Sequence, residues 1–333
     1  MLKLSAVRLV CSSLYLAIAA AVGSAQSLLV VNQGDASLSI VDPVSQRQIA
    51  VIAERTPTMH AHEIATSADG HTAYMPIYGN VGVGKPGLDG REMLFIDLPS
   101  RKVVGTLDFG HGVRPHQPVY DATRKLLYVT TELDQSVTVI DPQTKRIVGA
   151  IPTGQPQSHM LVLSHDGRRG YTANVGPGTV SALDLIGRKT IAVIPISKET
   201  QRISISNDDR WVFTSDQTQP RLAVIDTATS RVKQWVPLPG TGYGTAPTPD
   251  SRFLLVAVPS TNQVAVVDLA SMRVVRNIDV PSTPQEILIR PDGKIAYVSC
   301  NTSGQVAAID LAHWKVQTVI PAGKYADGLA WAK

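Results

Sequence analysis

The chain has 333 residues, a formal net charge of +4 and only two cysteines. This small charge, with no basic run interleaved with aromatic residues, argues against nucleic acid as a main partner. Only Cys300 lies beyond the first 25 residues, so an intramolecular disulfide is excluded there and stability must come from packing.

The first 25 residues have the pattern of a secretory signal peptide. Lys3 and Arg8 precede an apolar run over Leu14–Val22, and small residues end at Ala25. We expect cleavage near Ala25, a periplasmic or secreted protein, and no membrane span in the mature chain. The remaining residues, 26–333, contain no linker-like segment and are expected to form one domain and a monomer.

An aspartate that follows an aliphatic run recurs seven times in the chain. The positions are Asp42, Asp97, Asp141, Asp184, Asp226, Asp268 and Asp310, with spacings of 55, 44, 43, 42, 42 and 42. A period of this length with several short strands is typical of β-propeller blades, because one small sheet cannot bury its faces alone. The sequence therefore predicts an all-β fold, a seven-bladed β-propeller.

The third repeat shows the expected plan of one blade. Its β-rich runs are separated by Asp, Pro and Thr turns, without helical periodicity. The predicted strands are Gln117–Tyr120, Leu126–Thr131, Ser136–Asp141 and Arg146–Pro152.

The two ends of the chain are expected to share one blade. The first repeat starts at Leu28–Val31 with a second strand and lacks an inner one, whereas Tyr325–Ala332 has the pattern of an inner strand with nothing after it. We expect the C-terminal strand to complete the first blade and close the ring, which removes exposed sheet edges.

Several segments resemble the YVTN-type repeats of exported bacterial β-propeller proteins. These are Leu127-Tyr128-Val129-Thr130, Val139-Ile140-Asp141, Arg290-Pro291-Asp292-Gly293 and Ile295–Ser299. The resemblance covers nearly all of residues 27–333 and implies the propeller fold. It leaves the activity open, since similar propellers include sugar-lactone hydrolases, haem and copper enzymes, and binding proteins.

Alignment of the repeats places one residue per blade at the entry to each inner strand, beside the central channel. This first ring is expected to contain Ala326, His62, His116, His159, Gln201, Tyr243 and Gln285. Three consecutive blades thus supply histidine, and imidazoles converging from adjacent blades predict one divalent transition metal, zinc, copper or iron, held by His62, His116 and His159. The plainer interpretation is that these histidines line a wet channel.

The neighbouring residues complete the expected site. Glu63, Arg202 and Tyr243 are the candidate catalytic groups, with Glu63 as a fourth ligand or a base. His60, His111, Arg114 and Gln201 are the candidate cofactor-binding residues, because they are expected on the same face. The longest spacing marks a glycine-rich insertion within Gly79–Arg91, expected to act as a lid or recognition loop. The alternative is a tolerated surface insertion.

Two functional classes remain open at this point. The first is metal-dependent chemistry on a small molecule. The second is a non-catalytic binding or accessory propeller that holds a small ligand, a haem-like cofactor or a partner protein on the same face. Whether the chain is an enzyme is not decided by its residues.

Overall fold

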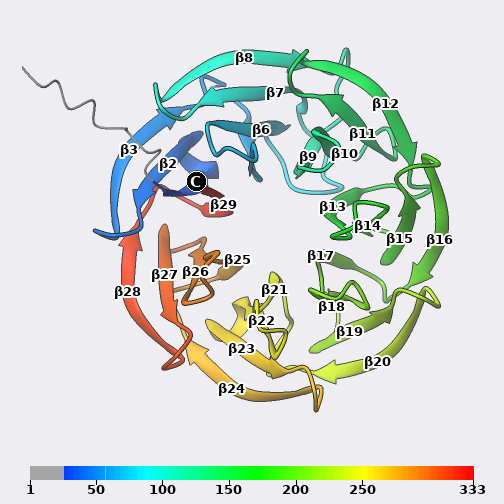
Figure 1. Cartoon of the computed structure of the whole chain (residues 1–333), viewed down its shortest axis with the longest axis vertical. Coiled ribbons are helices and arrows are strands. Elements are labelled where there is room, and N and C mark those ends of the chain that lie inside the picture. The colour runs from blue at the N-terminus through cyan, green and yellow to red at the C-terminus, as the bar shows by residue number, and fades with distance from the viewer. Residues whose placement is uncertain (1–25, 57) are drawn as a thin grey trace, which may run out of the picture.

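The computed structural model describes residues 26–56 and 58–333, so the predicted signal peptide lies outside the described residues. The strands of this part form seven antiparallel sheets arranged around a central axis (Figure 1). The predicted seven-bladed β-propeller is confirmed. Within the same residues no helix is long and apolar enough to cross a bilayer.

The strands of each blade follow one another from the channel outward. Blade 1 consists of β29 (Ala326–Ala332), β1 (Ser27–Asn32), β2 (Ser37–Asp42) and β3 (Arg47–Ala53). Blade 2 consists of β4 (His60–Ala61) and β5 (Ala65–Thr66), both beside β6 (Thr72–Gly79), then β7 (Asp89–Asp97) and β8 (Lys102–Asp108). Blade 3 consists of β9 (Pro115–Asp121), β10 (Leu126–Thr131), β11 (Ser136–Asp141) and β12 (Arg146–Pro152).

The other four blades follow the same order. Blade 4 consists of β13 (Ser158–Leu163), β14 (Arg169–Asn174), β15 (Thr179–Asp184) and β16 (Lys189–Pro195). Blade 5 consists of β17 (Thr200–Ile205), β18 (Trp211–Asp216), β19 (Arg221–Asp226) and β20 (Arg231–Pro237). Blade 6 consists of β21 (Thr245–Pro247), β22 (Phe253–Val258), β23 (Gln263–Asp268) and β24 (Arg273–Asp279). Blade 7 consists of β25 (Pro284–Ile289), β26 (Ile295–Cys300), β27 (Gln305–Asp310) and β28 (Lys315–Pro321), and the 3-10 turns η1 (Gln33–Asp35) and η2 (Pro259–Thr261) lie in blades 1 and 6.

The hydrophobic core lies between adjacent blades. Tyr74 and Phe95 of blade 2, for example, pack in one cluster with Leu127 and Ile140 of blade 3. The middle strands of each blade are covered on both faces, which explains their continuous apolar runs, whereas the outermost strands alternate between exposed and half-buried residues. Stacking of neighbours therefore buries what a single sheet exposes.

The repeated aspartate caps the turn between the third and fourth strands. Asp42 accepts hydrogen bonds from the backbone N–H of Val44 at 3.0 Å and of Ser45 at 3.2 Å. Asp141, Asp184, Asp226, Asp268 and Asp310 bond the following turn in the same way. The motif that defines the repeat is thus turn chemistry, in which a short acidic side chain holds its own backbone.

The ring closes as the sequence predicts. β29 pairs with β1, with Trp331 opposite Leu28 and Leu329 opposite Val30. In Figure 1 the C-terminal strand lies inside the first blade, next to the N-terminal strands. First and last segments of the chain therefore form one sheet.

Candidate functional site

The register of β29 corrects one member of the first channel ring. Trp331 pairs with Leu28 in blade 1 as Tyr120 pairs with Leu127 in blade 3. His116 lies four residues before Tyr120, and Asp327 lies four residues before Trp331. Asp327, rather than Ala326, is therefore the blade 1 residue equivalent to His116. The ring is Asp327, His62, His116, His159, Gln201, Tyr243 and Gln285. A carboxylate therefore stands beside the histidines.

The structure brings four histidines together at the channel mouth. The ring centroids of His62 and His116 are 5.2 Å apart, and those of His116 and His159 are 3.5 Å apart. His60, at the start of β4, stacks on His62 at 5.1 Å. The inner strands of blades 2, 3 and 4 place these rings, because each strand begins beside the axis.

A buried acceptor orients His159. Nδ1 of His159 is hydrogen-bonded to Oε1 of Glu132, and Glu132 also accepts the Tyr78 hydroxyl at 2.9 Å. Tyr78 packs edge-on against both His116 and His159. Because Nδ1 of His159 is directed to the carboxylate, its Nε2 atom faces Gln201, whose Nε2 lies at 3.3 Å. Carboxylate partners of this kind orient histidine ligands in metal sites.

Two buried ring nitrogens in this cluster lack hydrogen-bond partners among the described residues. They are Nε2 of His62 and Nδ1 of His116. Burial lowers the pKa values of both rings well below the ordinary histidine value, and neighbouring histidines and Arg202 lower them further. Both imidazoles are thus neutral at pH 7, which is the form that binds metal ions.

The arrangement is not that of a finished ion site. In the part of the chain that the structure describes, no three His, Cys, Asp or Glu side chains are disposed to hold one ion. The rings of His116 and His159 lie with their faces 32° from parallel, so stacking rather than a shared focus relates them. Coordination of one ion by His62, His116 and His159 stays a prediction.

A second cluster, which we call the arginine cluster, fills the channel beside the histidines. It consists of Arg202, Glu63, Asp327 and Glu286. Arg202 of blade 5 reaches across the axis to Oε1 of Glu63 at 2.6 Å and Oδ1 of Asp327 at 2.7 Å, and Glu286 lies at 3.5 Å. Arg202, Glu63 and Asp327 are each less than 5% exposed. The cluster joins blades 1, 2, 5 and 7.

This cluster holds more carboxylates than cations. Burial raises the pKa of Glu63 well above its ordinary value and the pKa of Asp327 to about 6, although Arg202 opposes both shifts. Burial alone lowers the Arg202 pKa, but the three carboxylates outweigh it and hold that pKa well above its usual range. Burial therefore favours the protonated form of Glu63, whereas Asp327, with a pKa of about 6, is mostly ionised at pH 7.

Gln33 connects the two clusters. Its side-chain Nε2 lies 3.1 Å from Nδ1 of His62 and also hydrogen-bonds Oδ2 of Asp327. Gln33 belongs to η1, in the loop between the two middle strands of blade 1. The protonation of Asp327 is thereby linked to the orientation of the His62 ring.

The insertion reaches toward blade 4 and is anchored by Arg114. The loop between β6 and β7 runs inside the ring toward β9 and β13 (Figure 1), and a Cβ at Gly84 would lie 2.8 Å from the Gln157 side chain of blade 4. Arg114 is 6% exposed and donates to Asp89 at 2.6 Å and to the Lys85 carbonyl at 2.8 Å. Arg114 is thus committed to the loop.

Three other predicted site residues have different surroundings. Gln201 contacts His159, and Tyr243 lies under the Arg202 guanidinium at 5.2 Å, both within the channel. Burial raises the pKa of Tyr243 to about 12, so it remains a neutral hydroxyl. His111 points away from the cluster, because its side chain is 63% exposed and pairs with Asp134 at 2.8 Å.

Sequence reasoning left some site residues out of the candidate set. Gln33, Tyr78 and Glu132 come from loops or second strands, where no repeat position marks them. Asp327 and Glu286 are members of the channel rings, so their places in the repeat were the available signal.

A cavity of about 430 Å³ opens at the channel mouth beside the histidines. It is lined by His60 and Met59 before the inner strand of blade 2, by the Gln33–Gly34 loop and by Tyr325. Histidine, methionine and tyrosine are all side chains that bind haem iron. Two cations, Arg55 and Lys324, are exposed in the segments that carry these residues.

Comparisons with known proteins agree with a β-propeller. The family model described as the cytochrome D1 heme domain matches residues 121–254, which is less than half of the chain. The matched part includes Glu132, His159 and Arg202 and does not include His60 or His62. A comparison with curated proteins finds no match.

Two solved structures are similar in fold. Hydrazine synthase of Kuenenia stuttgartiensis has a TM-score of 0.70 at 18% identity, covering 81% of this chain and 89% of that chain. Dihydro-heme d1 dehydrogenase NirN in complex with DHE has a TM-score of 0.65 at 15% identity, covering 91% of this chain and 74% of that chain. At these identities the likeness shows the fold alone.

The anchoring role of Arg114 gives a testable expectation for the lid. We expect Arg114→Gln to speed amide hydrogen exchange in residues 79–89, because the loop loses the side chain that holds Asp89 and Lys85. Arg91→Gln is the matched control, since Arg91 pairs with Asp108 on the surface. Exchange rates that stay the same in both variants would contradict the anchor.

Replacing Asn80–Gly90 by a short turn is likewise expected to lower the free energy of unfolding, because Arg114 would then be buried without its partners.

Proposed function

We propose that this chain is an exported β-propeller of the YVTN type that binds a haem-type tetrapyrrole at its channel mouth. The observation that carries the proposal is the set of neutral, buried histidines beside a cavity lined by His60, Met59 and Tyr325. The partial match to a heme-domain family and the DHE complex of a protein with the same fold support the ligand class. Export rests on the leader pattern of residues 1–25, which predicts a periplasmic or secreted protein.

The residues at the mouth suit such a ligand in donor type and charge. His60 is half-buried and borders the cavity, and His62 lies directly behind it with Nε2 unpartnered among the described residues. Burial lowers the pKa values of both rings, so each is a neutral imidazole near neutral pH. Binding of iron at Nε2 of His62 requires the tautomer with its proton on Nδ1, in which Gln33 does not donate to this ring. The exposed cations Arg55 and Lys324 are suited to the acidic groups that tetrapyrroles carry.

The protein's own groups have separate tasks in this proposal. His60 or His62 would bind the iron, and Gln33 lies between the His62 ring and Asp327. The arginine cluster stores protons within the channel, and the lid held by Arg114 limits access of water to His116 and His159. Bound haem iron supplies redox or Lewis-acid chemistry, and the chain positions it.

Titration of the purified protein with haemin tests the proposal. We expect a Soret band that shifts and saturates at one equivalent in the wild type, and at least tenfold weaker binding in His60→Ala or His62→Ala, by about 1.4 kcal/mol or more. If both histidines act on one iron, the loss of haemin-binding free energy in the double variant is expected to differ from the sum of the losses in the two single variants. His313→Ala is the matched control, because His313 is an exposed histidine paired with Asp310 in an outer turn.

The same preparations separate the haem proposal from a bare ion held by histidines. A divalent zinc, copper or iron ion is the second candidate, because the rings of His62, His116 and His159 are neighbours at the mouth. The stacked rings would have to turn for three nitrogens to reach one ion. Stoichiometric zinc, copper or iron without a Soret band, lost in His116→Ala and His159→Ala, would favour that ion. Absence of both haemin and metal uptake would overturn the metal-centred reading and leave a small organic ligand or a partner protein.

A further inference from the structure

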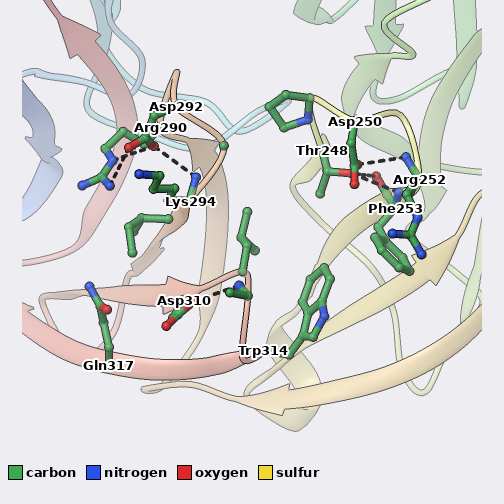
Figure 2. A pocket seen from close by; sticks show the side chains of 15 residues that line it. Thr248, Asp250, Arg252, Phe253, Arg290, Asp292, Lys294, Asp310, Trp314 and Gln317 are labelled. Carbon is green, nitrogen blue, oxygen red and sulfur yellow. Dashed lines mark hydrogen bonds and ion pairs between the residues drawn. The ribbon is translucent and has the colours of Figure 1, made fainter.

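A second cavity lies on the face opposite the histidines, between blades 6 and 7. It has a volume of about 830 Å³ and is formed by three turns, Thr248–Arg252, Arg290–Lys294 and Asp310–Trp314. Inner strands enter their blades at the histidine face and end at these turns, so the two sites are separated by the length of a strand. We call this cavity the blade 6/7 cleft (Figure 2).

The repeat supplies three equivalent clefts for comparison, of which the one between blades 1 and 2 has a volume of about 500 Å³. A cavity of about 250 Å³ lies between blades 5 and 6, and one of about 220 Å³ lies between blades 4 and 5. Nine of the ten residues lining the blade 5/6 cavity have a counterpart, 42 positions later, in the lining of the blade 6/7 cleft. The blade 6/7 cleft therefore belongs to a repeated series and has the largest volume of these four cavities.

Side chains that bridge the two smallest clefts explain why these two are narrower than the blade 6/7 cleft. His165 bridges blades 4 and 5, because its Nδ1 is hydrogen-bonded to Oδ1 of Asp209 at 2.6 Å. Asn207 crosses between blades 5 and 6 and donates to the Thr248 carbonyl at 2.8 Å and to Ser251 Oγ at 3.0 Å. At the next repeat the bridging position is a proline, which has no side-chain donor.

The position opposite this proline also changes. Pro249 takes the place of Asn207, and Gly293 takes the place of Ser251, 42 residues further along the chain. Neither has a side-chain hydrogen-bonding group, so the polar bridge between turns is absent and the cleft stays open. Among the described residues, no side-chain hydrogen bond links these two turns.

One wall of the cleft is aromatic. Phe253 and Trp314 meet edge to face, with centroids 5.0 Å apart and planes at 77°. Trp314 occupies a turn position at which the other six blades carry non-aromatic side chains. Those residues are Gln46, Arg101, Lys145, Arg188, Ser230 and Met272. The Trp314 side of this wall is thus specific to the blade 6/7 cleft, whereas the position of Phe253 is also aromatic in the blade 5/6 cavity, where it is Trp211.

The carboxylates of the cleft are engaged within their own turns. Asp250 accepts from Thr248 Oγ1 at 2.5 Å and Arg252 N at 3.1 Å, and Asp292 pairs with Arg290 at 2.7 Å. Asp310 accepts from the backbone N–H of Ala312 at 2.8 Å and pairs with His313.

Two cations are left without such partners. Arg252 and Lys294 are exposed, and neither forms an ion pair with any described residue. In Figure 2 Arg252 lies on the side of Phe253, and Lys294 lies across the cavity near Arg290 and Asp292. Arg252 also lies over the Phe253 ring, with its guanidinium carbon 5.1 Å from the ring centroid. A cation without an ion-pair partner therefore lies at each end of the cleft, and one of the two contacts the aromatic wall.

We propose that the blade 6/7 cleft is a second binding site, for an elongated aromatic ligand with an acidic group at each end. Its ring system packs on Trp314 and Phe253, where aromatic pairs gain energy beyond simple burial. Its acidic groups form charge-assisted hydrogen bonds with Arg252 and Lys294. A cavity of this volume lies in the range of small-molecule sites.

Isothermal titration calorimetry of the full chain with 2,6-naphthalenedicarboxylate tests the proposal. We expect one saturable site, and no comparable binding of the uncharged dimethyl ester of the same ring system. Trp314→Met, which copies Met272 of blade 6, is expected to weaken binding about tenfold, and Arg252→Gln and Lys294→Gln likewise. Arg210→Gln, at the position of Arg252 in blade 5, should leave the affinity unchanged.

A closing variant separates a true cleft site from surface attraction. Pro249→Asn with Gly293→Ser recreates the Asn207 and Ser251 pair, and we expect it to lose binding while its thermal transition stays near that of the wild type. Equal binding of diacid and diester, equal binding by the closing variant, or no saturation by the wild type up to about 5 mM would each overturn the proposal. None of these outcomes depends on haem at the opposite face.

Discussion

Deletion of Tyr325–Lys333 is expected to abolish the single cooperative unfolding transition and to produce aggregation. The deletion removes β29, whose Leu329 and Ala330 are 3% and 6% exposed, and uncovers Leu28 and Val30 of β1. It also removes Asp327 from the arginine cluster and leaves a sheet edge open to other chains. Thermal unfolding followed by circular dichroism and size-exclusion chromatography measure the effect.

Point variants in the same strand give graded controls. Leu329→Ala is expected to lower the free energy of unfolding by about 3 kcal/mol, because it leaves a cavity between blades. Tyr325→Ala, at a side chain that is half exposed, should change stability by less than about 1 kcal/mol. A truncated chain that stays monomeric and melts at the wild-type temperature would refute the closure of the ring.

Arg202→Met is expected to destabilise the protein by about 3–5 kcal/mol at pH 8, because it leaves buried carboxylates without their cation. The loss should be smaller at pH 5. Without Arg202 the pKa values of Glu63 and Asp327 rise further, so the folded variant binds more protons than the unfolded chain. Its free energy of unfolding therefore falls more steeply than that of the wild type as the pH rises above 5.

Urea unfolding at pH 5 and pH 8 measures this difference. Combining Arg202→Met with Glu63→Gln and Asp327→Asn should restore much of the lost stability at pH 8, because the uncompensated charges are removed together. Arg91→Met is the surface control, and we expect it to lower the free energy of unfolding by no more than about 1 kcal/mol at either pH. An effect of Arg202→Met that does not depend on pH would show that packing, rather than charge, explains its cost.

The fold could be predicted from the sequence because a local rule repeats along the chain. Each aspartate cap ends a third strand and begins a tight turn, so the turns of all seven blades are visible as one motif. Strand bounds in the third repeat follow the prediction, except that β9 begins at Pro115 and ends at Asp121. The closure of the ring could also be predicted from the sequence, because the first repeat lacks an inner strand and the last segment of the chain has the pattern of one.

The site could be predicted only as far as the repeat extends. His62, His116 and His159 occupy equivalent positions, and blade geometry alone brings such residues to the axis. The sequence prediction for blade 1 is wrong by one residue, because β29 is not followed by a turn that would set its register. Only its pairing with β1 shows that Asp327, rather than Ala326, lies in the ring.

Residues that leave the repeat required the tertiary structure. Gln33 reaches His62 and Asp327 from a loop, and Arg202 crosses the channel to partners 125 and more positions away. Local propensity and turn chemistry, which act over a few residues, determined the blades, their number and the convergence of the histidines. Contacts across the axis depend on side-chain lengths and on how seven sheets close into a ring, so tertiary packing alone decided which charges pair, which nitrogens stay free and which cleft stays open.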